Sequence, residues 1–196
     1  MRDWFVGGAV IQAGSLAANN SAGSSPASLP DAGQTRDEGQ AGDAGLVPSG
    51  VLLVENLRQN GKSDWTTPGG VIDPGETLLS GLTREVREET GLNVMRWSGL
   101  LYEILVEAPV LKWRLRVEVH LALEVHGEVT LGHDPDGIVI SSDWVSPQVC
   151  AERLQHAQPW VREPLMEWMT ERFESPREFV YELHGDAPHD VSVTRK

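Results

Sequence analysis

The chain is poor in cysteine and in uninterrupted apolar sequence. Cys150 is the single cysteine among 196 residues, so an intrachain disulfide is excluded and nothing indicates an oxidising compartment. No apolar run approaches the roughly 20 residues that a membrane-spanning helix requires, so no membrane partner is expected. Residues 4–12 are predicted to form a first β-strand instead of a signal peptide, because Asp3 dilutes the basic end and glycines interrupt the apolar run. We therefore expect a cytoplasmic protein.

Positive charge is also scarce. The chain has 16 Lys and Arg against 29 Asp and Glu, which gives a formal net charge of -13. Nucleic acids and anionic membranes bind through positive surface fields, so neither is an expected partner. A protein of this charge that handles phosphates needs metal ions to offset the repulsion.

Large apolar side chains are nearly missing between residues 13 and 50. Ala, Gly, Ser, Pro, Asn and Asp dominate this stretch, and it has no aromatic residue. Burial of so little apolar area does not offset the entropy cost of ordering the chain. We predict a disordered insertion at 13–50 between two strands, within a single domain that spans residues 1–196.

The remainder alternates between strand and helix patterns. From Leu111 to Val125, apolar residues alternate with polar ones, which is typical of a half-buried strand, and a turn near Pro109 joins this strand to the one before it. Further strands are expected at 51–57, 138–146 and 178–183, and amphipathic helices at 147–155 and 160–173. The mixture predicts an α/β domain whose sheet is covered by helices on both faces.

Residues 78–90 have the pattern of another amphipathic helix. Thr77 can cap its start, and Gly91 can end it in the left-handed conformation. Leu78, Leu82 and Val86 share one face, which is predicted to pack against the sheet.

Three glutamates, Glu85, Glu88 and Glu89, border this apolar face. Like charges at these spacings repel by a few tenths of a kcal/mol per pair even when exposed, and by more when partly buried. A cation would offset the repulsion, and oxygen ligands at this density suit Mg²⁺ or Mn²⁺. The preceding loop GGVIDPGE can add backbone carbonyls, and Arg84 can orient Glu85 by a charge-assisted hydrogen bond. The sequence therefore predicts a metal site built from a loop and a helix.

The spacing of these residues resembles the signature of the Nudix hydrolases. Gly70, Glu76 and the run REVREETGL from Arg84 to Leu92 match GX5EX7REUXEEXGU, in which U is aliphatic, at every specified position. The resemblance implies an α/β/α sandwich with a mixed β-sheet. It also implies Mg²⁺- or Mn²⁺-dependent hydrolysis of a diphosphate bond in a nucleoside diphosphate linked to another group. That substrate would be a nucleotide sugar, ADP-ribose, a dinucleotide or a damaged nucleotide.

Site roles follow from the same resemblance. Glu85, Glu88 and Glu89 would bind the metal together with the Gly70 carbonyl, while Arg84 and Glu76 would shape the loop and the helix. Glu85, Glu88 and Arg84 are therefore also among the catalytic candidates.

The catalytic base stays open between a glutamate of the helix and an acid from a later loop. The later acids are Asp134 and Asp136 in GHDPDG, and Glu128 just before it. Acids beside Pro and Gly are also common turn residues. Asp136 is the loop residue that we include among the catalytic candidates.

Arg114 and Arg116 lie on the polar face of the alternating strand. Both are candidates for substrate phosphate binding, although a strand face that is simply exposed to solvent has the same pattern.

Two functions on this fold remain in competition: a diphosphohydrolase, and a catalytically silent sensor that binds nucleotides without turnover. The three crowded carboxylates favour the enzyme, because a sensor does not need them. Either function implies a small-molecule nucleotide as partner, and a homodimer is compatible with the sequence.

Overall fold

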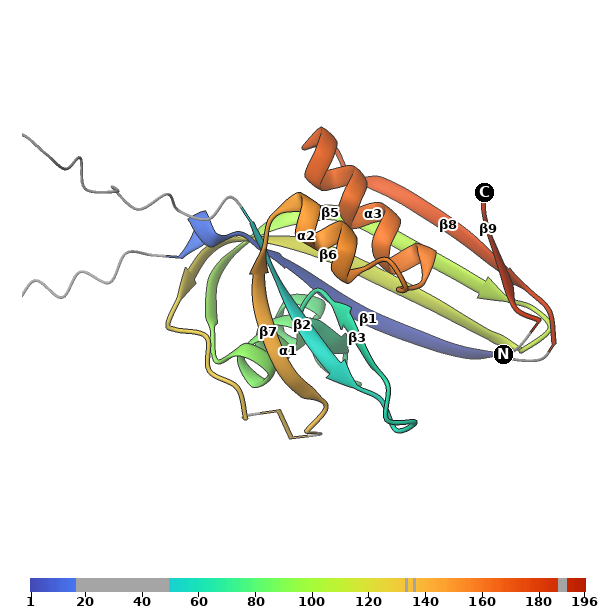
Figure 1. The fold of residues 1–196 in the computed structure, drawn as a ribbon, viewed down its shortest axis with the longest axis horizontal. Helices are drawn as coiled ribbons and strands as arrows, with labels where there is room; N and C mark the ends of the chain where they lie inside the picture. Colours follow the sequence, from blue (N-terminus) through green and yellow to red (C-terminus); the bar gives the residue numbers. More distant parts are fainter. Residues whose placement is uncertain (17–49, 133, 136, 187–189) are drawn as a thin grey trace, which may run out of the picture.

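A mixed six-stranded sheet runs through the length of the molecule (Figure 1). The computed structural model describes residues 1–16, 50–132, 134–135, 137–186 and 190–196. The strand order is β4-β1-β6-β5-β8-β9, and the bounds are β1 Arg2–Ile11, β4 Gly69–Val71, β5 Asn93–Ala108, β6 Trp113–His126, β8 Arg177–His184 and β9 Ser192–Arg195. The pairs β1–β6 and β5–β8 are parallel and the others antiparallel. The predicted mixed sheet is thus confirmed.

A smaller antiparallel sheet has the order β3-β2-β7. Its strands are β2 Val51–Leu57, β3 Ser63–Thr66 and β7 Val139–Val145. An isolated bridge between Gln12 and Val51 connects it to the end of β1. The two sheets therefore meet where β1 ends.

Helix α1 (Leu78–Thr90) has the limits that the sequence predicts. The Thr77 side chain accepts a hydrogen bond from the Ser80 amide, and Gly91 ends the helix with a φ of 73°. The other α-helices in the described residues are α2 (Pro147–Arg153) and α3 (Pro159–Glu171). None of the described helices has the length and apolar character needed to cross a membrane.

Helices cover both faces of the large sheet, as predicted. On β1, Ala9 and Ile11 share a buried cluster with Leu82 of α1. The intervening Val10 belongs to a second cluster that contains Leu165 of α3. Successive side chains of a strand point to opposite faces, so α1 lies on one face and α3 on the other (Figure 1).

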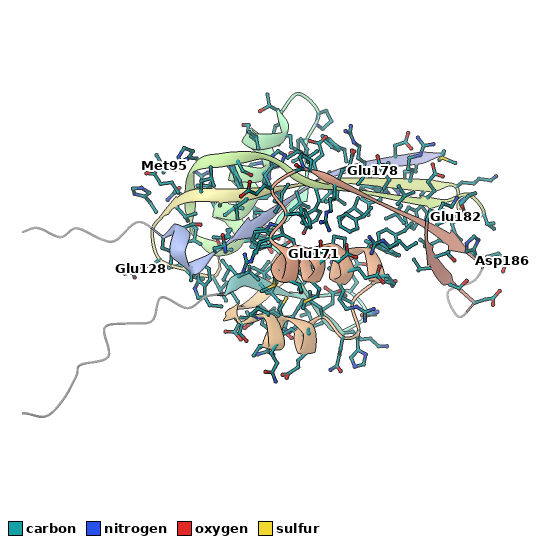
Figure 2. All side chains as sticks on the ribbon, turned by 90° about the horizontal axis from the view of Figure 1, so that it is seen from above. Met95, Glu128, Glu171, Glu178, Glu182 and Asp186 are labelled. Carbon is teal, nitrogen blue, oxygen red and sulfur yellow. The ribbon has the colours of Figure 1, made fainter. Side chains whose placement is uncertain are left out.

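The long strands β5 and β6 extend the sheet well beyond α1. Figure 2 shows Met95 and Glu128 at one end of the sheet and Glu182 and Asp186 at the other. The N-terminus lies near the second end, beside the β5–β6 turn, because Arg2 pairs with Trp113 (Figure 1).

The predicted insertion at 13–50 is narrower than expected. Ala13–Ser15 form a 3-10 helix, η1, and the Ser15 hydroxyl donates to the Ala122 carbonyl at 2.7 Å. The Ala13 amide donates to the Gly50 carbonyl at 3.2 Å. The ends of the stretch are therefore part of the fold, whereas residues 17–49 lie outside the described residues and their disorder stays a prediction.

The sequence did not predict the short strands β3, β4 and β9. Each has three or four residues, too few for a period of two to be recognised. β4 matters for function, because it carries the glycine pair that precedes α1.

Candidate functional site

A cavity of about 710 Å³ opens between β4, α1 and the α3 side of the large sheet. One part of its wall is acidic and is formed by Asp73, Glu85, Glu88 and Glu89. The other part is apolar and aromatic and is formed by Tyr102, Ile104, Leu115, Val117, Val119, Trp160 and Val161. The cavity therefore joins an acidic wall to an apolar and aromatic wall.

The glycine pair of β4 lets α1 approach the sheet edge. The Gly69 amide donates to Glu89 Oε2 at 2.8 Å. A Cβ on Gly69, whose φ is 143°, would lie 2.1 Å from the Gly7 carbonyl oxygen, and a Cβ on Gly70 would lie 2.4 Å from Glu85 Oε2. Only glycine fits at position 69, and a side chain at position 70 would displace the Glu85 carboxylate, so the loop and the carboxylates form one tightly packed unit.

Arg84 donates hydrogen bonds to three acids and lies 3.7 Å from a fourth, Asp73. Its Nη1 donates to Glu85 Oε1 at 2.8 Å and to Glu88 Oε2 at 3.1 Å. Its Nε and Nη2 donate to the two oxygens of Glu76 at 3.1 and 2.9 Å. These bonds raise the pKa of Arg84, and the bond to Arg84 lowers the pKa of Glu76. The predicted link between Arg84 and Glu85 is confirmed, and Glu76 ties the loop to α1.

Burial shifts the carboxyl groups on α1 toward their neutral form. Burial raises the pKa of Glu89 to about 8, against the opposing effect of the Gly69 amide. Burial also raises the pKa of Glu85, against the effect of Arg84. A bound cation would act in the opposite direction and stabilise both carboxylates.

The donor chemistry fits a hard divalent cation. Glu85, Glu88, Glu89 and the Gly70 carbonyl are all oxygen donors, and the missing Gly70 side chain leaves its backbone against Glu85. Within the described residues, no three acidic, histidine or cysteine side chains form a preformed metal cluster. The carboxylates bond instead to Arg84 and to the Gly69 amide.

Of the later acids, the structure brings Asp134 to the cavity. Its Oδ2 accepts hydrogen bonds from the amides of Ile138 and Val139 at 2.7 and 3.0 Å. Glu128 is exposed and does not line the cavity (Figure 2). Asp136 lies outside the described residues.

Arg114 and Arg116 face away from the cavity. Leu115 and Val117, the alternate residues of β6, line it, so the arginines project from the other face of the sheet. Arg116 pairs with Glu103 and with Glu118, and Arg114 lies 3.5 Å from Glu107. The structure does not bring the two arginines to this site.

Three further cavity residues had no recognisable sequence signal. Arg58, directly after β2, forms a bidentate pair with Asp64 at 2.9 and 2.7 Å, and the buried Asn56 of β2 donates to Thr66 Oγ1 at 2.9 Å. Trp160 reaches the cavity from α3. These residues come from segments about a hundred positions apart, so only the packed fold shows that they share a cavity.

The fold class agrees with solved structures. A MutT protein from Methanosarcina mazei Go1 matches with a TM-score of 0.58 and 17% identity over 89% of this chain and 97% of that one. The ORF135 protein of E. coli matches with a TM-score of 0.56 and 19% identity over 89% of this chain and 96% of that one. These likenesses define an α/β/α fold of the Nudix type.

The family follows from the sequence match. The model of the NUDIX domain family matches residues 41–169, which is more than half of the chain. The protein belongs to the Nudix hydrolase superfamily.

Curated relatives match over different lengths. The 8-oxo-dGDP phosphatase NUDT18 of Homo sapiens is 42% identical over 43 residues, which is 22% of this chain and 13% of the relative. This chain therefore spans only a small part of NUDT18. Phosphatase NudJ of Escherichia coli strain K12 is 27% identical over 140 residues, which is 70% of this chain and 84% of the relative.

Proposed function

We propose that this protein hydrolyses the diphosphate bond of a nucleoside diphosphate linked to another group, with Mg²⁺ or Mn²⁺ as cofactor. The observation that carries the proposal is the contact between the Gly69 amide and Glu89, because it places the acidic face of α1 at the mouth of a cavity with an aromatic wall. The names of two relatives, a phosphatase and an 8-oxo-dGDP phosphatase, agree with phosphate chemistry.

Glu85, Glu88, Glu89 and the Gly70 carbonyl are the groups that would hold the cations. When bound, divalent cations polarise a diphosphate and lower the pKa of a water. Arg84 keeps Glu85 and Glu88 at fixed positions through its two bonds from Nη1. Glu76, on the other side of the guanidinium, prevents Arg84 from turning away.

The reaction breaks one bridging P–O bond. The water oxygen bonds to one phosphorus, the bridging oxygen leaves with its electron pair on the second phosphate, and the water proton passes to a carboxylate. A glutamate of α1 or an acid of the 134–136 loop accepts this proton. Asp134 is the loop acid at the cavity wall, and burial raises the basicity of Glu89.

The apolar wall would bind the nucleoside of the substrate. Trp160 provides aromatic surface, and the almost fully buried Tyr102, Ile104 and Val119 form an apolar floor. A nucleobase stacked on such a surface leaves its phosphates directed toward α1.

A silent nucleotide sensor is the competing function. An ionised Glu89 destabilises the folded chain, because burial opposes its ionisation. A protein that only binds nucleotides does not need this residue. Turnover decides between the two functions.

The test is a substrate panel of nucleoside diphosphate sugars, ADP-ribose, dinucleotides and oxidised nucleotides with Mg²⁺ or Mn²⁺. Release of a nucleoside monophosphate or phosphate is the expected result, and the Glu89→Gln variant is the control for contaminating hydrolases. Nucleotide binding without any release would overturn the proposal in favour of the sensor.

A further inference from the structure

A second hollow of about 520 Å³ lies at the far end of the same sheet face. It is formed where the start of β1 meets the β5–β6 turn, beside the N-terminus in Figure 1. Its walls contain the aromatic side chains Trp4 and Trp113, the apolar Leu111 and the cations Arg2 and Lys112. We call it the distal hollow.

The distal hollow continues the cavity beside α1. Val6 and Leu115 line both spaces. Trp4 precedes Val6 by two residues on the same face of β1, which is about 7 Å along a strand. One ligand can therefore lie along β1 and β6 and occupy both spaces.

The side chains of the distal hollow suit an aromatic anion. Trp4 is 37% exposed, and the Arg2 guanidinium lies 4.2 Å from its ring centroid. Among the described residues, no acid is within ion-pair distance of Arg2 or Lys112, whereas Arg114 and Arg116 on the opposite face are both paired. In a chain of net charge -13, two such cations beside the exposed Trp4 ring and the half-buried Trp113 ring complement a nucleobase and its phosphate.

We infer that the distal hollow binds the second nucleoside of a dinucleoside polyphosphate whose scissile diphosphate lies at the carboxylates of α1. The inference rests on the proposed function, because it places the hydrolysed bond at the carboxylates of α1. Trp4 and Trp113 provide the stacking surface, and Arg2 and Lys112 contact the phosphate next to the second nucleoside. A second copy of this chain would compete for the exposed apolar side chains, but the continuity with the first cavity favours the ligand.

The test compares two methylene-bridged probes that cannot be hydrolysed, an analogue of diadenosine tetraphosphate and one of adenosine tetraphosphate. They differ in the second nucleoside and, with it, in the charge of the phosphate that carries this nucleoside. Calorimetric titration of the full chain with Mg²⁺ should give about tenfold tighter binding of the two-nucleoside probe, which is the usual scale of one stacked base. The Trp4→Leu variant should lose this preference and keep its affinity for the single-nucleoside probe.

Lys112→Asn provides an independent variant at an exposed turn. Lys112 has a φ of 57°, a conformation that asparagine adopts readily, so this substitution removes the charge without straining the fold. The affinity for both probes should fall about threefold, and about as much in Arg2→Gln, because each variant removes a contact to a phosphate that both probes carry. Arg96→Gln, an exposed arginine at the other end of the sheet, should leave it unchanged.

Equal binding of the two probes by the wild-type chain would overturn the inference, as would an undiminished preference in Trp4→Leu or an undiminished affinity for both probes in Lys112→Asn. Sedimentation of the same proteins tests whether a second copy of this chain occupies the distal hollow. A wild-type dimer that Trp4→Leu converts to a monomer would also overturn the inference. If the wild-type chain prefers the two-nucleoside probe but hydrolyses no substrate of the panel, the distal subsite stands and the proposed hydrolase function is rejected. Turnover without preference would reject the subsite alone.

Discussion

Glu89 combines two demands that conflict in the absence of a metal. Burial makes its charged form costly, while its contact with the Gly69 amide fixes it at the mouth of the cavity. A carboxyl whose folded pKa is about 8, against 4.5 in the unfolded chain, binds protons more tightly when folded. Its contribution to stability is therefore present at low pH and is lost as the pH rises toward 8.

The substitution Glu89→Gln should stabilise the metal-free protein. The gain should be absent near pH 4, where the carboxyl is neutral in both states, and should grow to about 1–3 kcal/mol near pH 8. Turnover should fall by orders of magnitude, because the variant holds a cation poorly. Urea unfolding in chelator at several pH values, set beside rates on a working substrate, tests both parts.

Glu174→Gln is the matched control, since Glu174 is exposed and lies outside the cavity. It should change neither stability nor rate. Wild-type turnover in Glu89→Gln would remove Glu89 from the metal-binding set.

Arg84→Lys tests the geometry of the guanidinium separately from its charge. Lysine keeps the charge but cannot bond Glu76, Glu85 and Glu88 from one planar group. We expect kcat to fall about 10–100-fold, the scale of a lost supporting contact at a metal site. Stability should fall by less than about 1 kcal/mol, because Arg84 is partly exposed.

Arg96→Lys, at an exposed pair with Glu124, should be silent in the same assays. If Arg84→Lys retains full kcat, the charge of Arg84 matters and its planar geometry does not.

At the scale of elements, the close approach of β4 to β1 positions the loop before α1. Gly69 pairs with Gly8, and the Gly69 φ of 143° leaves no room for a Cβ near the Gly7 carbonyl. The position of α1 depends on this contact, because Glu89, the acid of α1 that faces the loop, accepts a hydrogen bond from the Gly69 amide.

Gly69→Ala should therefore separate β4 from β1. We expect a loss of about 2–4 kcal/mol in the free energy of unfolding, together with most of the activity. Gly99→Ala in β5 is the control: nothing lies within 4 Å of an added Cβ there, so stability should change by less than about 0.5 kcal/mol. Denaturant unfolding of both variants gives the comparison, and equal stability would show that the loop tolerates a shifted β4.

At the scale of the whole molecule, metal binding should couple to stability. A cation that binds the folded chain alone stabilises it by about 2.7 kcal/mol at a hundredfold excess over its Kd. Mg²⁺ or Mn²⁺ should therefore raise the Tm of the wild type, and chelator should reverse the rise. Glu89→Gln should show a much smaller rise. An equal rise in both proteins would place the binding elsewhere.

The low-complexity stretch provides a second test at this scale. Its ends already lie together, since the Ala13 amide bonds to the Gly50 carbonyl, and loop-closure entropy depends weakly on length. Deletion of residues 21–45 should leave Tm and activity nearly unchanged. A deletion that also removes residues 13–16 should lower the Tm, because the Ser15 bond to Ala122 is lost. A large loss from the shorter deletion would reject the prediction of disorder.

The amino-acid sequence by itself determined the local parts of this protein. The limits of α1 depend on Thr77 and Gly91, which act on their immediate neighbours, and the confirmed link from Arg84 to Glu85 joins adjacent residues. The spacing of Gly70, Glu76 and the glutamates was enough to identify the family, because all of them lie in one continuous stretch of the chain. The caps and the helical periodicity of that stretch act within a few residues.

Tertiary structure alone decided which face of each strand meets the cavity. The alternation from 111 to 125 shows that β6 has an apolar face and a polar face, but both faces contain side chains that could bind a nucleotide. Packing against α3 turned Leu115 toward the cavity and left Arg116 on the opposite face with Glu103. The same packing brought Trp160 to the cavity from α3, because contacts between distant segments depend on how sheets and helices stack, which no local pattern specifies.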